Sequence, residues 1–172
     1  MKTAVVLMAI AAALVLQTAL AGLMVGRPIA VNLVLIAVVY LALSYGAVTG
    51  MLAGTIGGLA QDALAGGIVG IGGMTKTIVG FAVGVLGAQF NLSTTVPRLV
   101  MFVAATFVHE MMFAGLHALV GGRPFAFLYS TALVQALVNG LVGVTVFLIV
   151  ERGPDAMQRR RMSRGTLGRK RY

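Results

Sequence analysis

An isolated carboxylate stands in the glycine-rich stretch GGLAQDALAGG (57–67), in a chain that holds only four acidic residues among 172. It belongs to Asp62, which apolar residues and glycines flank on both sides. A charge inside an apolar membrane segment is costly, so it is expected to serve a functional site or to be paired. Lys76 follows after a short connection. We expect these two charges either to pair near one membrane face or to reach water separately.

A second group of ionisable residues lies in VHEMMFAGLHALV (108–120), near the middle of an apolar segment. The zinc protease motif needs another histidine four residues after His109, and that position is Phe113. Glu110 and His117 are seven residues apart, so they share a helix face. A metal would need a third ligand, and the chain has only two histidines. We therefore expect a buried polar cluster that fixes helix packing, or a site for a partner helix or small ligand, rather than a metal.

The amides Gln135 and Asn139 form, together with Gly143, a ridge of residues four apart in the last apolar segment. Amides on membrane helices tend to hydrogen-bond to a neighbouring helix, which contributes about 0.6–2 kcal/mol per contact. We expect Glu110 to bond to one of these two amides.

No arrangement of residues typical of an enzyme is present. No serine, histidine and aspartate set has a workable spacing. The glycines of GGIVGIGG (66–73) lack the preceding strand that a nucleotide-binding loop requires. The sequence therefore predicts a protein that is not an enzyme and that binds no cofactor.

Glycines at four-residue intervals lead toward the isolated carboxylate. Positions four apart lie on one ridge of a helix, and glycines there let two helix backbones approach closely in lipid. A short connection joins the two segments that carry such ridges, so they should be antiparallel neighbours whose ridges face each other or a third helix. The ridges comprise Gly50, Gly54, Gly58 and Asp62 in one segment and Lys76, Gly80 and Gly84 in the next.

The elements that position these residues are long apolar segments. The chain is 59% hydrophobic with a mean hydropathy of +1.01, which is too apolar for a soluble domain of this length. Crossing a bilayer takes about 20 apolar residues in a helix. We therefore predict an all-α integral membrane protein with six transmembrane helices. They span approximately residues 3–24, 29–44, 47–64, 75–90, 98–120 and 125–150.

The first apolar segment also has features of a secretory signal peptide. Lys2 precedes it, and Ala19-Leu20-Ala21 offers a small-x-small cleavage pattern. The apolar run is longer than the core of a usual signal peptide, so we expect an uncleaved helix. The chain has no cysteine, which excludes disulfides and thiolate metal ligands.

The positive charge is concentrated at the C-terminus. The net charge is +9, and eight of the 13 basic residues lie at Arg152 or beyond. We predict a transmembrane domain of residues 1–151 and a disordered cytoplasmic tail of residues 152–172. The tail would fix topology and attract anionic lipid, at about 1 kcal/mol per basic residue, or would dock a cytoplasmic partner. Nothing accompanying the charge indicates nucleic-acid binding.

Orientation follows from the basic residues near the ends of the segments. A cytoplasmic tail and six crossings place the N-terminus on the same side, so both termini are predicted to be cytoplasmic. Arg98 then falls in a cytoplasmic loop, whereas Arg27, Lys76 and Arg123 fall outside singly.

The order of these features resembles the rod shape-determining protein MreD family. The resemblance is carried by residues 27–87, with an Arg-Pro entry to the second helix, a tyrosine near its end, and glycines stepping toward an aspartate. Ile29 departs from the family, which often has an acidic residue after the proline. The matching positions are Arg27, Pro28, Tyr40, Gly46, Gly54, Gly58, Asp62, Gly66, Gly70, Gly80 and Gly84.

The resemblance implies a non-catalytic scaffold in the bacterial inner membrane. Members of the family partner MreC, which has a single membrane helix and a periplasmic domain, in the elongasome that builds the lateral peptidoglycan of rod-shaped cells. MreB, RodA and a penicillin-binding transpeptidase are further implied partners. The glycine ridges would then be surfaces for the chain's own helices and for the MreC helix.

The family is in turn similar to the substrate-binding subunits of energy-coupling-factor vitamin transporters, which are six-helix proteins of similar length. Such a subunit is the alternative function, since its docking ridges are also made of small residues. The short outer loops, with few aromatic or polar residues to line a vitamin pocket, favour the scaffold.

Overall fold

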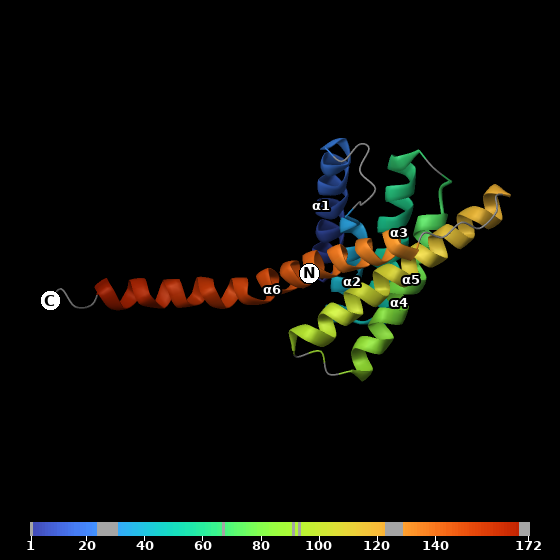
Figure 1. Ribbon diagram of the computed structural model, residues 1–172. Coiled ribbons are helices and arrows are strands. Elements are labelled where there is room, and N and C mark those ends of the chain that lie inside the picture. The colour runs from blue at the N-terminus through green and yellow to red at the C-terminus, as the bar shows by residue number, and fades with distance from the viewer. Residues whose placement is uncertain are drawn as a thin grey trace.

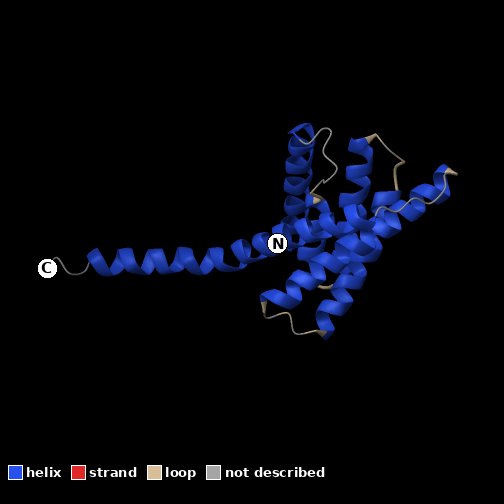
Figure 2. Cartoon of the chain, in the orientation of Figure 1, coloured by secondary structure: helices blue, strands red, loops and turns tan. Residues whose placement is uncertain are grey.

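The computed structural model describes residues 2–23, 31–66, 68–90, 92, 94–122 and 129–168, and for residues 2, 21–23 and 152–168 it describes the backbone alone. All regular structure in these residues is helical, as predicted, and Figures 1 and 2 show the arrangement. The helices are α1 (Lys2–Leu23), α2 (Leu33–Tyr45), α3 (Ala47–Ala65), α4 (Ile71–Gln89), α5 (Thr95–Gly121) and α6 (Tyr129–Gly168).

Among the described residues, four helices are long and apolar enough to cross a membrane, so this is a membrane protein with several apolar helices. The other two differ from that pattern. α2 has only 13 residues, which rise about 20 Å, and α3 is rich in glycine and polar near its end. That α2 and α3 also cross the membrane stays a prediction. The four candidate spans are Thr3–Leu20, Ile71–Gln89, Thr95–Gly121 and Tyr129–Glu151.

The short helix α2 lies at the centre of the molecule. It contacts each of the other five helices, and most of its side chains are buried, among them Val34, Leu35, Val38 and Leu41, which have no exposed surface. A helix that is apolar all round is stable where apolar groups surround it on all sides. For α2, those groups come largely from the protein rather than from lipid.

The remaining helices form two groups around α2. α3 and α4 pack on each other most extensively, α1 packs on α2 and α3, and α5 packs on α6 and α4. Within the part of the chain that the structure describes, α1 makes no close backbone contact with α6, and α3 makes none with α5 or α6. The bundle is therefore open between α1 and α3 on one side and α5 and α6 on the other.

The connection between α3 and α4 is shorter than predicted. Gly66 and Gly70 adopt φ angles of +67° and +113°, which L side chains rarely adopt. α4 begins at Ile71, four residues before the predicted start near Thr75. The glycines of residues 71–73 are thus part of the helix and not of the loop.

An ion pair joins the beginning of α5 to α6. Arg98 Nη1 and Nη2 lie 2.5 Å and 3.1 Å from the two carboxylate oxygens of Glu151, and Arg98 Nε donates to the carbonyl of Leu92 at 2.6 Å. The guanidinium also lies 4.2 Å from the ring centre of Phe147. These contacts hold the two helices together where the apolar part of α6 ends.

α6 continues as a helix to Gly168 and extends beyond the other helices in Figure 1. Residues 152–168 therefore have helical backbone, whereas their composition predicted a segment without regular structure. The division into two domains at residue 151 stays a prediction.

Candidate functional site

The glycine ridges of α3 and α4 face each other. A Cβ added to Gly50 would lie 2.5 Å from the carbonyl oxygen of Gly80, and one added to Gly54 would lie 2.5 Å from the carbonyl carbon of Lys76. At Gly58 a Cβ would lie 2.5 Å from Cα of Gly73. Real Cβ atoms do not approach this closely, so the two backbones touch only because side chains are missing there.

The same packing leaves no room for a further helix on these ridges. Gly84 lies against the backbone of Ala47, and in the other pair Gly143 of α6 lies against the ring of Phe102 of α5. Each ridge is occupied by a helix of the same chain. These glycine faces, to which the family resemblance also assigned a partner helix, are therefore already covered by the chain's own helices.

Asp62 caps the beginning of α4. Its Oδ2 accepts hydrogen bonds from the backbone N–H groups of Gly70, Gly72 and Gly73, at 2.9, 2.9 and 3.2 Å. The first N–H groups of a helix have no partner within the helix, and the helix dipole favours an anion at that end. The carboxylate on α3 therefore supplies the hydrogen-bond acceptor for the first N–H groups of α4. This allows α4 to begin at a buried position and explains its early start.

The hypothesis that Asp62 and Lys76 form a direct ion pair is not supported by the geometry. Among the described residues, the ion pairs within 4.0 Å are Arg98–Glu151 and His109–Glu110. Lys76 is 2% exposed and lies within electrostatic reach of both Asp62 and Glu110. The side chain is thus largely enclosed by protein, and access of the ammonium to water stays a prediction.

The beginning of α2 is capped by side chains from three places in the chain. Asn32 Oδ1 accepts from the N–H of Leu35 at 3.1 Å, Gln17 of α1 accepts from Leu33 at 2.7 Å, and Asn139 of α6 accepts from the N–H of Asn32 at 3.1 Å. These three amides lie in segments that are otherwise largely apolar. They satisfy backbone donors that a helix beginning inside the bundle would leave unpaired.

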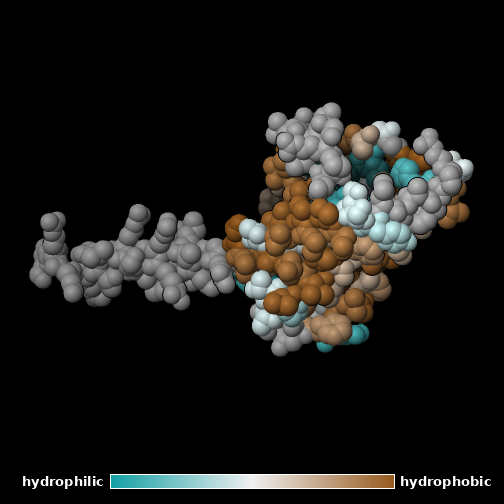
Figure 3. All heavy atoms as spheres, viewed as in Figure 1, coloured by the Kyte–Doolittle hydropathy of each residue, from teal (hydrophilic) through white to brown (hydrophobic). Residues whose placement is uncertain are grey.

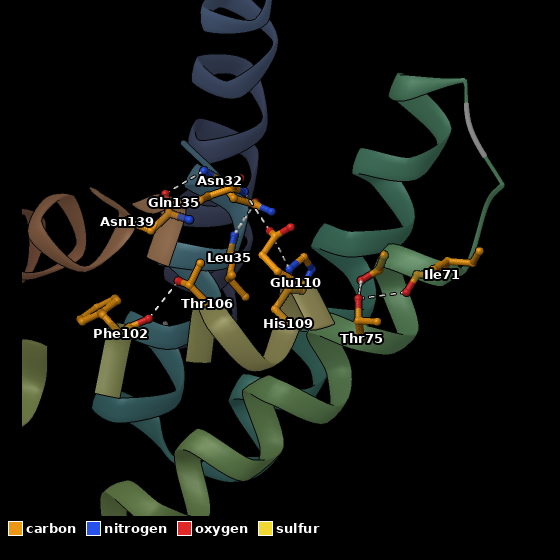
Figure 4. Close-up of polar contacts among 11 residues, drawn as sticks. Asn32, Leu35, Ile71, Thr75, Phe102, Thr106, His109, Glu110, Gln135 and Asn139 are labelled. Atoms are coloured by element: carbon orange, nitrogen blue, oxygen red, sulfur yellow. Dashed lines mark hydrogen bonds and ion pairs between the residues drawn. The ribbon is translucent and has the colours of Figure 1, made fainter. Parts of the chain in front are cut away.

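The predicted contact between Glu110 and an amide of the last apolar segment is confirmed, with Gln135 as the partner. Gln135 Nε2 donates to Glu110 Oε1 at 2.9 Å, and His109 Nδ1 lies 3.3 Å from the same oxygen. Figure 4 shows these side chains gathered between α5 and α6, beside the start of α2 with Asn32 and Asn139. We call Lys76, His109, Glu110, Gln135 and Asn139 the polar cluster.

His117 lies outside the polar cluster. It is exposed, and its ring packs 4.7 Å from that of Phe113. His109 lies on a different face of α5 and is buried, with 2% of its surface exposed. The buried face of α5 passes through Phe102 and Thr106 to His109, and steps of four and three residues along the helix could have indicated it.

Three buried side-chain atoms have no hydrogen-bond partner within the described part of the chain. They are Asn139 Nδ2, His109 Nε2 and Gln61 Oε1. Buried polar atoms are nearly always paired, so such a group marks a place where something further binds or where packing overrides pairing. In the same part of the chain, no group of three or more His, Asp or Glu side chains could hold a metal ion.

An apolar groove runs along α2 between α1 and α6. Its volume is about 440 Å³. Alanines and larger apolar side chains line most of it, with tyrosines toward one end. The lining residues are Val5, Ala9, Ala12, Ala13, Leu16, Leu33, Ile36, Ala37, Tyr40, Leu41, Tyr45, Val146 and Val150.

Comparison with known proteins identifies the family. No curated protein and no solved structure matches the chain significantly, so the similarity to vitamin-transporter subunits stays a prediction. The family model described as rod shape-determining protein MreD matches residues 1–152, which include all of the helices except the extension of α6. The chain therefore belongs to the rod shape-determining protein MreD family.

Proposed function

We propose that this protein is a non-catalytic scaffold of the elongasome that binds the single membrane helix of MreC and so helps to maintain rod shape and lateral peptidoglycan synthesis. Membership of the family supports a role in determining cell shape. The specific proposal of MreC binding rests on the groove along α2. The glycine ridges are not available for this, because the chain's own helices already occupy them.

The groove has the properties that a membrane helix requires. Its lining is largely apolar, and Ala9 and Ala13, four residues apart on α1, face it together with Ala37 of α2. Small residues at such spacing let a second helix approach closely in lipid. A helix seated there would contact α1, α2 and α6 together and would cover the part of α2 that the protein itself leaves open.

The other proposed contacts lie on the cytoplasmic side. With both termini inside, in the inner membrane, the extension of α6 would carry its basic residues toward anionic lipid or a cytoplasmic partner. MreB, RodA and a penicillin-binding transpeptidase would then meet the protein through MreC or through this extension.

Replacement of alanines in the groove tests the proposal. Ala13→Leu and Ala37→Leu should each reduce copurification of MreC at least about tenfold and round the cells, because the larger side chains fill the groove. Ala82→Leu is the matched control, since Ala82 is exposed on α4 and does not line the groove. Undiminished copurification of MreC with both groove variants, at normal expression, would refute this docking site.

A further inference from the structure

A hydrophilic recess opens where the two groups of helices separate. Figure 3 shows a hollow that contains hydrophilic atoms in an otherwise largely hydrophobic face, near the end of α3 and the beginning of α6. Polar side chains that are neither fully buried nor fully exposed occur on the helices that border this gap and just before α2. They are Gln17, Asn32, Gln61, Glu110 and Gln135.

Two opposite charges in the polar cluster are incompletely paired. Lys76 Nζ has no hydrogen-bond or ion-pair partner within the part of the chain that the structure describes, although the side chain is 2% exposed. Glu110 uses Oε1 for Gln135 and His109, which leaves Oε2 without a protein donor there, and its side chain is 21% exposed. Asp62 is the stronger electrostatic partner of Lys76, but the two form no ion pair within 4.0 Å, and Oδ2 of Asp62 already accepts from three backbone N–H groups.

The separation of these two charges is what points to a ligand. Lys76 and Glu110 influence each other electrostatically, yet they are more than 4.0 Å apart and form no ion pair. In a low-dielectric setting, incompletely paired charges are costly. Asn139 Nδ2 and His109 Nε2, buried in the same cluster without partners, add hydrogen-bonding capacity that the protein does not use.

We propose that the recess binds a zwitterionic group that carries an acid and a primary ammonium, as the headgroup of an ethanolamine phospholipid does. The acid group accepts from Lys76, and the ammonium donates to Glu110. A purely anionic group would meet the Glu110 carboxylate, and a purely cationic one would meet the Lys76 ammonium, so only a zwitterion satisfies both.

The open side of the bundle suits a lipid. Because α3 makes no close backbone contact with α5 or α6, a headgroup can enter from the bilayer while its acyl chains stay outside. Exposed apolar side chains, including Leu64 beside Gln61 at the end of α3, flank the opening. A free small zwitterion would share the headgroup chemistry, but it would gain nothing from these apolar flanks.

The choice of headgroup gives a test that needs no mutation. The full-length protein is exchanged into equimolar mixtures of phosphatidylethanolamine, phosphatidylcholine and phosphatidylglycerol of identical chains, and bound lipid is counted by native mass spectrometry. We expect one ethanolamine lipid to be retained at least about tenfold over either other lipid. The choline headgroup has no N–H to donate to Glu110, and the glycerol headgroup has no cation.

Two variants assign the site. Lys76→Gln and Glu110→Gln should each lower retention of the ethanolamine lipid at least about tenfold, whereas Glu151→Gln, the same change at a carboxylate outside the cluster, should leave it unchanged. Equal retention of the three lipids by the unmodified protein, or a preference that survives in both folded variants, would overturn the proposal. Competition with free phosphoethanolamine separates the two sources. Displacement of the lipid assigns the site to the headgroup alone, and failure to displace it assigns the site to the whole lipid.

Discussion

At the scale of single residues, four polar side chains serve the beginnings of helices. Asp62 receives the first N–H groups of α4, and the amides Gln17, Asn32 and Asn139 receive those of α2 or of the residue before it. A helix that begins in a place without water needs such acceptors, because each unpaired buried donor costs about 1–3 kcal/mol. Four of the few polar side chains in this sequence therefore serve the beginnings of two helices.

Asp62 provides the sharpest test of that role. Asp62→Ala should lower the free energy of unfolding in detergent by about 2 kcal/mol, because the acceptor for three N–H groups is lost. Gln61→Ala, one residue earlier in the same helix, removes a side chain whose Oε1 has no partner, and should change stability by no more than about 0.5 kcal/mol. Equal effects of the two substitutions would contradict the capping role.

At the scale of elements, the α3–α4 pair depends on the absence of Cβ atoms at defined positions. Gly54 and Gly57 lie on the same helix but meet different neighbours. A Cβ at Gly54 would strike the backbone of Lys76 and Thr77, whereas a Cβ at Gly57 would meet flexible side-chain atoms of Val34, at 3.0 Å, and Ile10. Backbone cannot move aside as a side chain can, so the two glycines are predicted to differ in tolerance.

Gly54→Ala should destabilise the protein by about 3 kcal/mol or prevent its accumulation, and Gly57→Ala should cost about 1 kcal/mol or less. Chemical unfolding in detergent, with the amount of folded protein in the membrane as a second readout, measures both. A tolerated alanine at Gly54 would mean that the helices are not held by backbone contact.

The sequence could predict those features of the helices that a regular spacing of residues indicates. The four-residue spacing of Gly50, Gly54 and Gly58 predicted a close-packed ridge, because that spacing reports directly on one helix face. It could not indicate that α4 starts at Ile71, since this start depends on a carboxylate from another helix. It also could not separate Gln135 from Asn139 as the partner of Glu110, because both lie on one ridge and only the crossing of α5 and α6 distinguishes them.

At the scale of the whole molecule, the six helices of the described residues were predicted, but only four of them are long and apolar enough to cross a membrane. The central position of α2 was not predicted. An apolar run alone does not distinguish a helix surrounded by lipid from one surrounded by protein. The predicted placement of both termini on the cytoplasmic side rests on the basic residues of the C-terminal segment and is open to direct measurement.

Because the chain contains no cysteine, single-cysteine variants report topology without further changes. With both termini cytoplasmic and six crossings, Val69→Cys should react with a membrane-impermeant maleimide in intact spheroplasts. Leu92→Cys and Ser163→Cys should react only after the membrane is permeabilised. Labelling of Ser163→Cys in intact spheroplasts would contradict the predicted orientation. Labelling of Leu92→Cys alone under these conditions would contradict the predicted number of crossings.

The short length of α2 has an electrical consequence. Its 13 residues rise about 20 Å, whereas the hydrocarbon layer is about 30 Å thick. Water in the hydrophilic recess beside the first residue of α2 would bring the electrical potential of the bulk solution to the level of that residue. The voltage would then fall across roughly two-thirds of the usual thickness, so the local field along α2 would be about one and a half times as steep as in the surrounding lipid.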